Sequence, residues 1–480
     1  MIQGTASGVG KSVLVAGLCR LLARNGVRVA PFKPQNMSNN AAVTIDGGEI
    51  GRAQALQAFA CGIEPSVDMN PVLLKPEADC TSQLVVLGRV VGRLESARFR
   101  EDRKIWLDMV LASFERLKAL YDVVIVEGAG SPAEPNLREG DIANMGFAEA
   151  ADIPVWLVGD IDCGGVFASL TGTLNILSET ERARVTALLI NRFRGHLALL
   201  DDGLNWLQEN SGKKIAGVVP WLPLQLPEED APYRLGASVA DSAAKLNIAV
   251  VMYPRASNLD DLDPLAAEPG VSLRLVNRPE KLQPVDVVIL PGCKHVAADL
   301  SWLREQGFAE ALQSHLRYGG RVLGICGGMQ MLGTSIVDEH EVESAHSVTG
   351  LGWLDMHTRM QAEKTLKRVD AMARWPAEVP VHGYEIHYGD GHPDEALFPF
   401  SHRSADGLVW GTYVHGLFAS GEFRRAWLAA MGVDTANAVD HDTRVMASLD
   451  LLADALEASL DPDLLVPLLA AGDCRQRDKA

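Results

Sequence analysis

The sequence lacks several features that would place it in a specialised class of proteins. Its 480 residues include seven cysteines, an odd number without any C-x-x-C pair, which argues against a disulfide framework or a zinc site. No basic block offsets the net charge of −18, so a nucleic-acid partner is not expected. The N-terminus has no charged leader before an apolar core, and no uncharged apolar run reaches about 18 residues. We therefore expect a cytoplasmic globular protein without a membrane partner.

Short apolar runs alternate with amphipathic segments along the first half of the chain. Helices are predicted at residues 13–24, 104–121 and 167–177 from the spacing of their apolar positions. Buried strands are predicted in "GVRVAPFKP" and at residues 122–130, 153–160 and 185–193. This alternation predicts a parallel sheet covered by helices on both faces, that is, a doubly wound α/β domain.

The chain begins with a glycine-rich stretch, "MIQGTASGVGKS", that indicates a phosphate-binding loop. Such a turn exposes backbone N–H groups to phosphate oxygens, while Lys11 reaches the outer phosphates and Ser12 reaches a magnesium ion. The usual first glycine is replaced by Thr5, and the nearest glycine lies one residue earlier. The predicted nucleotide contacts are Gly4, Thr5, Gly8, Gly10, Lys11 and Ser12.

The strand that leads into this loop is short. It has only Met1 to Gln3, whereas a central strand usually has five or six residues. We expect the neighbouring strands to keep unpaired backbone groups, and the chain to bind ATP weakly or fold poorly compared with one extended upstream of Met1 by apolar residues. The sequence leaves open whether Met1 is the natural start.

A Pro-rich acidic stretch, residues 220–232, separates this half from a second α/β pattern. Strands are predicted at residues 246–253, 286–292 and 321–328, with more β character at 370–418 and a clear strand at 407–416. The tail at 444–471 is predicted to be helical. We expect a nucleotide-binding domain at 1–220, a linker at 221–244, a second α/β domain at 245–435 and a helical tail at 436–480.

The second domain contains a candidate nucleophile. In "GICGGMQ", Cys326 lies between a predicted strand and a predicted helix, a sharp turn that exposes its side chain and offers following N–H groups to an oxyanion. The helix N-terminus also favours the thiolate. His415, in "YVHGLF", could serve as its base. The alternative for each is an ordinary buried cysteine or core histidine, but glycines flanking a cysteine at a strand end favour the catalytic interpretation.

The segments around Cys326 and His415 resemble a class I glutamine amidotransferase domain. The resemblance implies that Cys326 attacks the glutamine amide and that His415 moves the proton. It implies an oxyanion hole at the backbone of Gly292 and Gly327, with Gln330 holding the glutamine. Most class I members have Glu two residues after the histidine, where this chain has Leu417. The cobyrinate-type branch shares this loss, which leaves open what orients His415.

Many further segments, from Ile2 to Leu428, resemble the cobyric acid synthase family. They are "QGTASGVGKS", "PFKPQNMSNNA", "DGGEIGRAQALQA", "NPVLLKP", "VEGAGSPAEPNL", "ANMGFAEAADIPVWLVGDID", "GGVFASLTGT" and "HGYEIHYG". The glycine-rich loop is also similar to that of dethiobiotin synthetase, which shares the shifted first glycine. The resemblance implies a dethiobiotin synthetase-like ATP- and corrinoid-binding domain. It implies that ATP activates the b, d, e and g carboxylates of adenosylcobyrinic acid a,c-diamide for amidation by glutamine-derived ammonia.

The same resemblance implies roles for polar residues in the first domain. ATP and Mg²⁺ are the implied cofactors, with Ser12 and Glu127 as metal ligands. Asp46 is a further metal candidate, and an exposed loop acid is the alternative for it. Asn191 either contacts the adenine edge or caps a turn. The polar cluster after the second strand is implied to line the corrinoid site, with an ordinary turn as the alternative; its members are Gln35, Asn36, Ser38 and Asn40.

The chain departs from the family pattern at Cys163, where the family usually has Arg, at Cys293, where it has Ser, and at His196, where it has Asp. The first departure puts one basic substrate contact in doubt.

One rival is the synthase that makes the a,c-diamide, but its Gly-Pro-Asp-Tyr motif is replaced here by "QNMSNN". A ParA- or MinD-like ATPase switch would have an extra loop lysine and no cysteine elbow. A non-catalytic scaffold would not need both Lys11 and Cys326. The sequence does not indicate an oligomeric state.

Overall fold

The computed structural model describes residues 1–78, 81–95, 103–227, 244–282, 284–343, 347–391, 398–399, 402–434 and 439–477. The chain divides into two compact units. Unit 1 comprises Met1–Ser38, Thr44–Leu226 and Val445–Ala480, and unit 2 comprises Asn39–Val43 and Pro227–Arg444. The expected helical tail at 436–480 thus belongs with the nucleotide-binding half only from Val445 on, and five residues from that half of the sequence belong with the second unit. Most of the expected linker, residues 228–243, lies outside the described residues.

The centre of unit 1 is a parallel sheet. Its strands are β1 (Ile2–Gly4), β2 (Val29–Phe32), β9 (Val123–Val126), β10 (Val155–Asp160), β11 (Val185–Phe193) and β12 (Lys214–Pro220). The pairings run β2-β9 and β1-β10-β11-β12, and a parallel bridge between Ile2 and Glu127 joins the two sets. Because every strand has the same direction, all carboxyl ends lie at one edge of the sheet.

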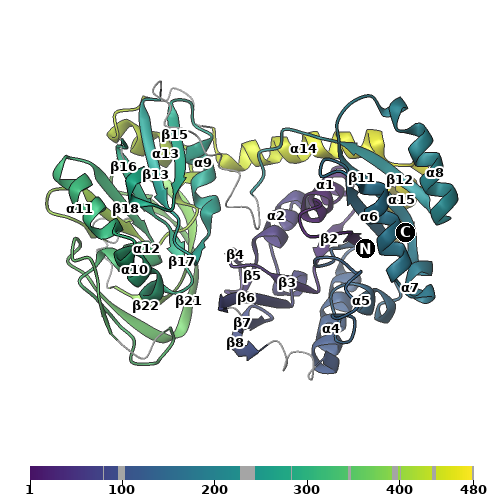
Figure 1. Cartoon of the computed structure of the whole chain (residues 1–480), viewed down its shortest axis with the longest axis horizontal. Helices are drawn as coiled ribbons and strands as arrows, with labels where there is room; N and C mark the ends of the chain where they lie inside the picture. The colour runs from purple at the N-terminus through teal and green to yellow at the C-terminus, as the bar shows by residue number, and fades with distance from the viewer. Residues whose placement is uncertain are drawn as a thin grey trace. The chain divides into compact units, whose positions relative to one another are not determined.

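Helices cover both faces of this sheet, because successive strand residues point to opposite sides. Val158, Ala187 and Leu189 pack in one core with α1 (Lys11–Arg24), α14 (His441–Ser459) and α15 (Pro462–Arg477). Their neighbours Leu157 and Leu188 pack on the other side with α6 (Val166–Ile176) and α8 (Asp201–Ser211). Further along that side, α4 (Arg103–Leu120), which is labelled in Figure 1, packs on β2 and β9 in a third core. The predicted doubly wound fold is confirmed.

Strand β1 is short, as the sequence indicated, but its neighbours are paired. The Trp156 N–H donates to the Met1 carbonyl at 2.8 Å, and the Thr5 N–H donates to the Val158 carbonyl at 2.9 Å. On the opposite side, the Gly128 N–H donates to the Ile2 carbonyl at 2.8 Å. The expectation of unpaired backbone groups next to β1 is therefore wrong for these positions, since residues flanking the strand continue its hydrogen bonds.

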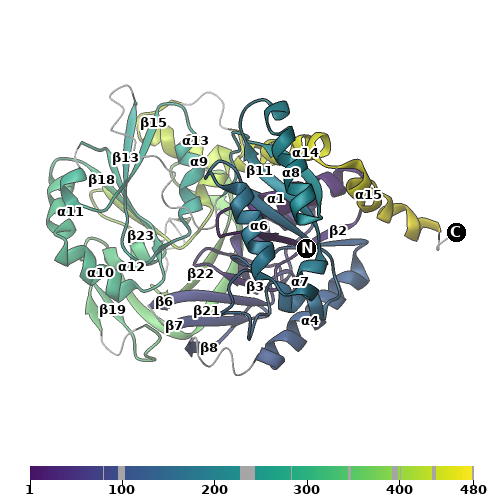
Figure 2. The ribbon, with the colours of Figure 1, turned by 45° about the vertical axis from the view of Figure 1, so that its right-hand side comes forward.

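A smaller sheet in unit 1 has the order β3-β6-β7-β8. Its strands are β3 (Gln35–Met37), β6 (Val72–Ala78), β7 (Thr81–Val86) and β8 (Arg89–Glu95), of which the last three lie side by side in Figure 2. Helix α2 (Arg52–Cys61) packs against α1. The remaining elements of the first half are β4 (Ala41–Val43), β5 (Glu49–Gly51), α5 (Met145–Ala150), α7 (Glu179–Arg184) and two 3-10 turns, η1 (Val67–Met69) and η2 (Leu197–Leu199).

Unit 2 contains a six-stranded sheet of order β15-β13-β16-β18-β24-β23. The strands are β13 (Leu246–Val251), β15 (Val271–Val276), β16 (Val287–Leu290), β18 (Arg321–Ile325), β23 (His402–Arg403) and β24 (Val409–Thr412). All pairings are parallel except that of β23. Its helices are α9 (Asp263–Ala266), α10 (Val296–Glu305), α11 (Phe308–Arg317), α12 (Gly327–Leu332) and α13 (Gly421–Ala430). The predicted second α/β domain is confirmed.

A second sheet in unit 2 has the order β20-β19-β21-β22. It consists of β19 (Ser335–Val337), β20 (Val348–Thr349), β21 (His357–Ala373) and β22 (Val379–Asp390), with the long pair β21 and β22 antiparallel. A two-stranded pairing joins β14 (Ala256–Ser257) to β17 (Gly292–Cys293). The described part of this unit also has the 3-10 turns η3 (Leu259–Leu262), η4 (Pro279–Lys281) and η6 (Leu417–Ala419).

A buried ion pair anchors the helix that follows His415. The guanidinium of Arg424 in α13 is fully buried, pairs with Glu268 at 2.9 Å and donates to the carbonyls of Phe418 and Val439. Arg444 pairs with the same carboxylate at 2.9 Å. Since a buried charge is stable only when it is paired, this arginine fixes the turn η6 against α13.

We expect Arg424→Ala to lower the free energy of unfolding by about 3 kcal/mol, because it removes one partner of a buried charge and leaves carbonyls unsatisfied. Calorimetric or urea unfolding measures this. Arg116→Ala is the matched control, since Arg116 pairs with Asp68 on an exposed surface and its loss should cost less than about 1 kcal/mol. Equal effects of the two substitutions would contradict the assignment.

Candidate functional site

Cys326 lies at the turn from β18 into α12. Its backbone has φ +50° and ψ −111°, which is unusual for a non-glycine residue and characteristic of a strained nucleophile elbow. The turn is fixed by the Cys326 N–H, which donates to the Thr412 carbonyl at 2.7 Å. Gly328 is needed behind the turn, because a Cβ there would lie 2.0 Å from the Leu290 carbonyl oxygen. The predicted sharp turn at this cysteine is confirmed by its backbone geometry, but the Cys326 side chain is buried and not exposed as expected.

The structure brings His415 to this cysteine and also shows what orients its ring. His415 Nδ1 lies 2.7 Å from Asp261 Oδ2, and the other carboxylate oxygen accepts the Gly416 N–H at 2.7 Å. Because a carboxylate only accepts hydrogen bonds, Nδ1 carries the proton and the second ring nitrogen is left for Cys326. The ring also stacks on Tyr384, with centroids 5.3 Å apart. His415 and Asp261 therefore form a hydrogen-bonded pair next to Cys326, the order of groups found in a catalytic triad, and their catalytic roles stay predictions.

The charge around His415 favours its protonated form. Burial lowers the pKa of this imidazole, but the Asp261 carboxylate and the hydrogen-bonded Cys326 outweigh burial and raise the pKa to about 10. A protonated imidazole beside the sulfur can donate a proton to a leaving amine. The sequence interpretation missed Asp261, which lies in the acidic run "NLDDLDP". That run was a signal of a carboxylate, but nothing in its spacing connected it to a histidine 154 residues later.

The two expected oxyanion positions lie next to this triad. A Cβ on Gly292 would lie 3.0 Å from His415 Cε1, and one on Gly327 would lie 2.6 Å from the sulfur of Cys293. A side chain at either position would therefore crowd the His415 ring or the Cys293 side chain. Gln330 is buried, and its amide nitrogen lies 3.4 Å from the Tyr413 hydroxyl. The proximity of Gly292 to His415 is consistent with an oxyanion hole, which stays a prediction together with the glutamine contact of Gln330.

The glycine-rich loop lies at the carboxyl edge of the sheet in unit 1. Gly10 has φ +94°, and a Cβ there would lie 2.3 Å from the amide nitrogen of Asn191, so only glycine fits. That nitrogen donates to the Val9 carbonyl at 2.9 Å, which ties the end of β11 to the loop. The Lys11 ammonium donates to the carbonyls of Ala6 and Gly130 at 3.0 and 2.8 Å. Asn191 thus shapes the loop, and its contact with adenine stays a prediction.

Glu127, at the end of β9, is the centre of a buried polar cluster beside this loop. Its carboxylate accepts hydrogen bonds from the Ser12 hydroxyl at 2.7 Å and the Gln57 amide at 2.6 Å, and pairs with the Lys33 ammonium at 2.9 Å. Burial raises the pKa of Glu127, but Lys33, Gln57 and Ser12 outweigh it and hold the pKa below its usual range. The carboxylate is therefore ionised. Sequence reasoning found Ser12 and Glu127 but missed Lys33 and Gln57.

This cluster fits a magnesium ion. Mg²⁺ typically takes one or two protein oxygens and completes its shell with phosphate and water oxygens, and Ser12 and Glu127 offer such a pair. Within the described ranges, no three His, Cys, Asp or Glu side chains group closely enough to hold a metal by themselves. Asp46 is exposed in a turn and accepts a hydrogen bond from the Thr44 hydroxyl, so its metal role stays a prediction.

The four residues expected at the corrinoid site are divided between the two units. Asn36 and Ser38 are buried in unit 1, where the Asn36 amide donates to Gln54 at 3.1 Å. Gln35 is half-buried in β3, and Asn40 belongs to unit 2. Cys163 is exposed, with its sulfur 3.5 Å from Asp160, and cannot supply the basic contact usual in the family. Their roles toward a substrate stay predictions.

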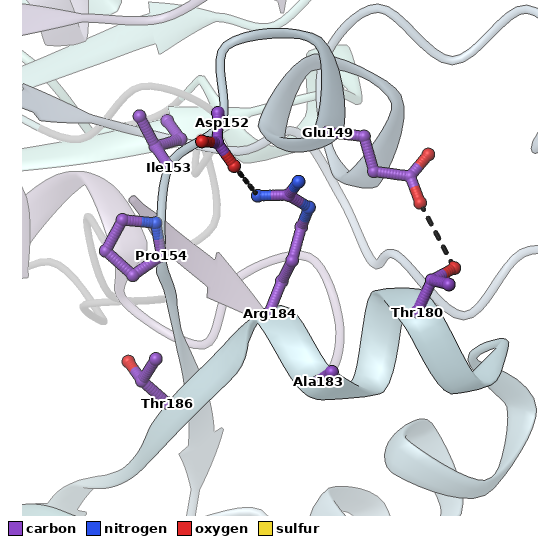
Figure 3. A pocket seen from close by; sticks show the side chains of 8 residues that line it. All are labelled: Glu149, Asp152, Ile153, Pro154, Thr180, Ala183, Arg184 and Thr186. Carbon is purple, nitrogen blue, oxygen red and sulfur yellow. Dashed lines mark hydrogen bonds and ion pairs between the residues drawn. The ribbon is translucent and has the colours of Figure 1, made fainter.

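One open pocket of unit 1 lies away from this site (Figure 3). Its wall includes Pro154 and Thr186, at the amino ends of β10 and β11, and an ion pair of 3.0 Å between Arg184 and Asp152 crosses it. The phosphate loop and Glu127 lie at the carboxyl ends of the strands. Since ligands of doubly wound sheets bind at the carboxyl edge, this pocket is not the nucleotide site.

The comparisons with known proteins agree with both halves of the geometry. Residues 247–423 match the CobB/CobQ-like glutamine amidotransferase domain, and residues 1–232 match the CobQ/CobB/MinD/ParA nucleotide-binding domain. The chain is thus an amidotransferase with a nucleotide-binding domain, as the resemblance implied. No helix in the described part of the chain is both long and apolar enough to cross a membrane.

The full-length relatives define the family further. The chain is 60% identical over 469 residues to a cobyric acid synthase of Halorhodospira halophila, covering 98% of this chain and 97% of that protein. It is 52% identical to a cobyric acid synthase of Novosphingobium aromaticivorans, covering 98% of each. The chain belongs to the cobyric acid synthase family, and the expectation from the sequence motifs is confirmed.

Asp261→Asn should reduce the turnover of glutamine by about 100-fold or more, because the imidazole loses the group that orients and charges it. The His415 pKa should also fall from about 10, so the alkaline loss of kcat/KM moves to lower pH. Glutaminase rates across the pH range measure both effects. Asp406→Asn, in an exposed turn of the same unit, is the control. If the alkaline loss of kcat/KM occurred at the same pH in Asp261→Asn as in the wild type, Asp261 would not be the group that raises the pKa of His415.

Proposed function

We propose that this chain converts adenosylcobyrinic acid a,c-diamide into adenosylcobyric acid by amidating its b, d, e and g carboxylates, using ATP and ammonia released from glutamine. The observation that carries the proposal is the strained Cys326 elbow beside a hydrogen-bonded His415–Asp261 pair, in a chain that also has a Gly-Lys-Ser phosphate loop. Its full-length relatives carry the name cobyric acid synthase. We infer a cytoplasmic location, because ATP and glutamine are supplied there.

In unit 2, the Cys326 thiolate attacks the side-chain carbonyl carbon of glutamine. The negatively charged oxygen of the tetrahedral intermediate accepts hydrogen bonds from backbone N–H groups at Gly292 and Gly327. Protonated His415, held by Asp261, gives its proton to the amide nitrogen. The C–N bond then breaks, the nitrogen leaves as ammonia, and the glutamyl group stays bound to the Cys326 sulfur as a thioester. His415 then takes a proton from water, whose hydroxide displaces the sulfur and releases glutamate. The carboxylate of Asp261 keeps the ring in position throughout.

In unit 1, ATP makes the substrate carboxylate reactive. A carboxylate oxygen attacks the γ-phosphorus, ADP leaves, and the acyl phosphate then reacts with ammonia to give an amide and inorganic phosphate. The Lys11 ammonium neutralises charge on the transferring phosphoryl group. Ser12 and Glu127 would hold Mg²⁺, which lowers the charge of the phosphates. Asn191 contacts the adenine edge in this proposal, and Asp46 is the weaker metal candidate.

The site for the corrinoid substrate is proposed at the carboxyl edge of the parallel sheet of unit 1, near β3, which follows β2 in the chain. Gln35, Asn36 and Ser38 offer amide and hydroxyl groups that suit the carboxylates and carboxamides on the rim of a corrinoid. Glutamine and the corrinoid are the proposed small-molecule partners. The a,c-diamide synthase stays the alternative within this chemistry, and product masses from incubations with each corrinoid, ATP, Mg²⁺ and glutamine distinguish the two. A ParA/MinD-like switch would have no use for the Cys326 triad.

Cys326→Ser should abolish amidation with glutamine, because a serine hydroxyl beside His415 is a far weaker nucleophile than the thiolate. Free ammonia should still support amidation at close to the wild-type rate, since unit 1 is unchanged. Corrinoid product masses with each nitrogen source measure this. Cys61→Ser, at the end of α2, serves as the control. Full glutamine use by the Cys326 variant would show that the nucleophile lies elsewhere.

Lys11→Ala should remove amidation with either nitrogen source, with a loss of at least 100-fold, because no acyl phosphate forms without charge neutralisation at the phosphates. Hydrolysis of glutamine alone should persist. Phosphate release and corrinoid mass together report the two half-reactions. Lys118→Ala is the control, because Lys118 pairs with Glu115 on the surface. Substantial ammonia-dependent product from the Lys11 variant would rule out the ATP site.

A further inference from the structure

Five residues of the first half of the sequence are built into unit 2. Residues 39–43 belong to unit 2, although Ser38 before them and Thr44 after them belong to unit 1. Ala41, Ala42 and Val43 are all buried. A short segment that leaves its own unit and is buried in another has a structural or catalytic partner there, so its polar contacts indicate what it does.

The polar contacts of this segment converge on Asn258. The Asn258 N–H donates to the Asn40 side-chain oxygen at 2.7 Å, and the Asn258 amide donates to the Ala41 carbonyl at 3.1 Å. Asn258 is buried and has φ +55°, a left-handed conformation that asparagine adopts more readily than most residues. The hydrogen bonds to Asn40 and Ala41 stabilise Asn258 in this conformation.

Asn258 in turn holds two groups that fix His415. It precedes the turn η3 that carries Asp261, and the Asp261 N–H donates to the Asn258 carbonyl at 3.2 Å. Its amide also donates to the Tyr384 hydroxyl at 2.7 Å. The ring of Tyr384 stacks on His415, and their backbones exchange hydrogen bonds of 3.1 and 2.8 Å. Asn258 thus links Asp261 and Tyr384, the two residues that contact the imidazole of His415.

We propose that Asn40 is a positioning residue of the glutaminase: it holds Asn258, so that Asp261 and Tyr384 keep the His415 ring directed at Cys326. This role rests on the proposed function of the Cys326 triad. It differs from the corrinoid contact that the sequence suggested for Asn40. The two roles predict different results. A positioning role affects only glutamine hydrolysis, whereas a corrinoid contact affects amidation with any nitrogen source.

The test compares Asn40→Ala with Asn40→Asp in the full chain. Alanine removes the oxygen that accepts the Asn258 N–H, and aspartate keeps it. For Asn40→Ala we expect kcat of glutamine hydrolysis to fall about 10-fold or more with little change in KM, because binding of glutamine does not use this residue. The alkaline loss of kcat/KM should move to lower pH, since a displaced Asp261 supports the imidazolium less. Asn40→Asp should restore most of the activity. Ammonia-dependent amidation should be unchanged in both variants.

Several outcomes would overturn the proposal. A wild-type kcat and pH profile in Asn40→Ala would show that Asn258 does not need this partner. Loss of ammonia-dependent amidation would assign Asn40 to the corrinoid site instead. Asn210→Ala, on an exposed helix of unit 1, is the matched control, and its profile should equal that of the wild type. If the wild-type chain did not amidate the corrinoid with ammonia, the proposed function would fail, while the glutaminase comparison would still decide the role of Asn40.

Discussion

Burying a carboxylate costs several kcal/mol unless opposite charge and hydrogen bonds satisfy it, and each unit of this chain has such a group at its site. In unit 1 it is Glu127, held by Ser12, Lys33 and Gln57. In unit 2 it is Asp261, whose oxygens accept from His415 and the Gly416 N–H. The donors come from separate elements of each fold, so satisfying one charge fixes the relative positions of several loops.

The two carboxylates have different chemical consequences. Glu127 is surrounded by donors that keep it ionised, and it accepts a hydrogen bond from Ser12 of the phosphate loop. Asp261 instead acts through its neighbour, because it raises the pKa of His415 and fixes which ring nitrogen faces the sulfur. The same physical requirement therefore gives an ionised carboxylate beside the phosphate loop in one unit and a charged imidazole beside Cys326 in the other.

Much of the fold and of the site could be predicted from the sequence, because local signals were strong. The buried strands at 122–130 and 185–193 and the elbow at Cys326 each depend on a few neighbouring residues, and the structure contains all three. Asp261 could not be predicted, because its partner is distant in the sequence and acidic runs are usually solvated. The position of residues 39–43 in unit 2 depends on tertiary contacts alone, and no periodicity in five residues could indicate it.

The path of the chain between the two units has a consequence for how they are made. The chain enters unit 2 after Ser38, returns at Thr44, enters again after Leu226 and returns at Val445. A cut between residues 228 and 243 would therefore leave each fragment with a piece of the other unit's fold: residues 39–43 on the first, and α15 with most of α14 on the second. Two separately synthesised halves could assemble only by exchanging these pieces. A single gene keeps the two pieces at a fixed stoichiometry during folding.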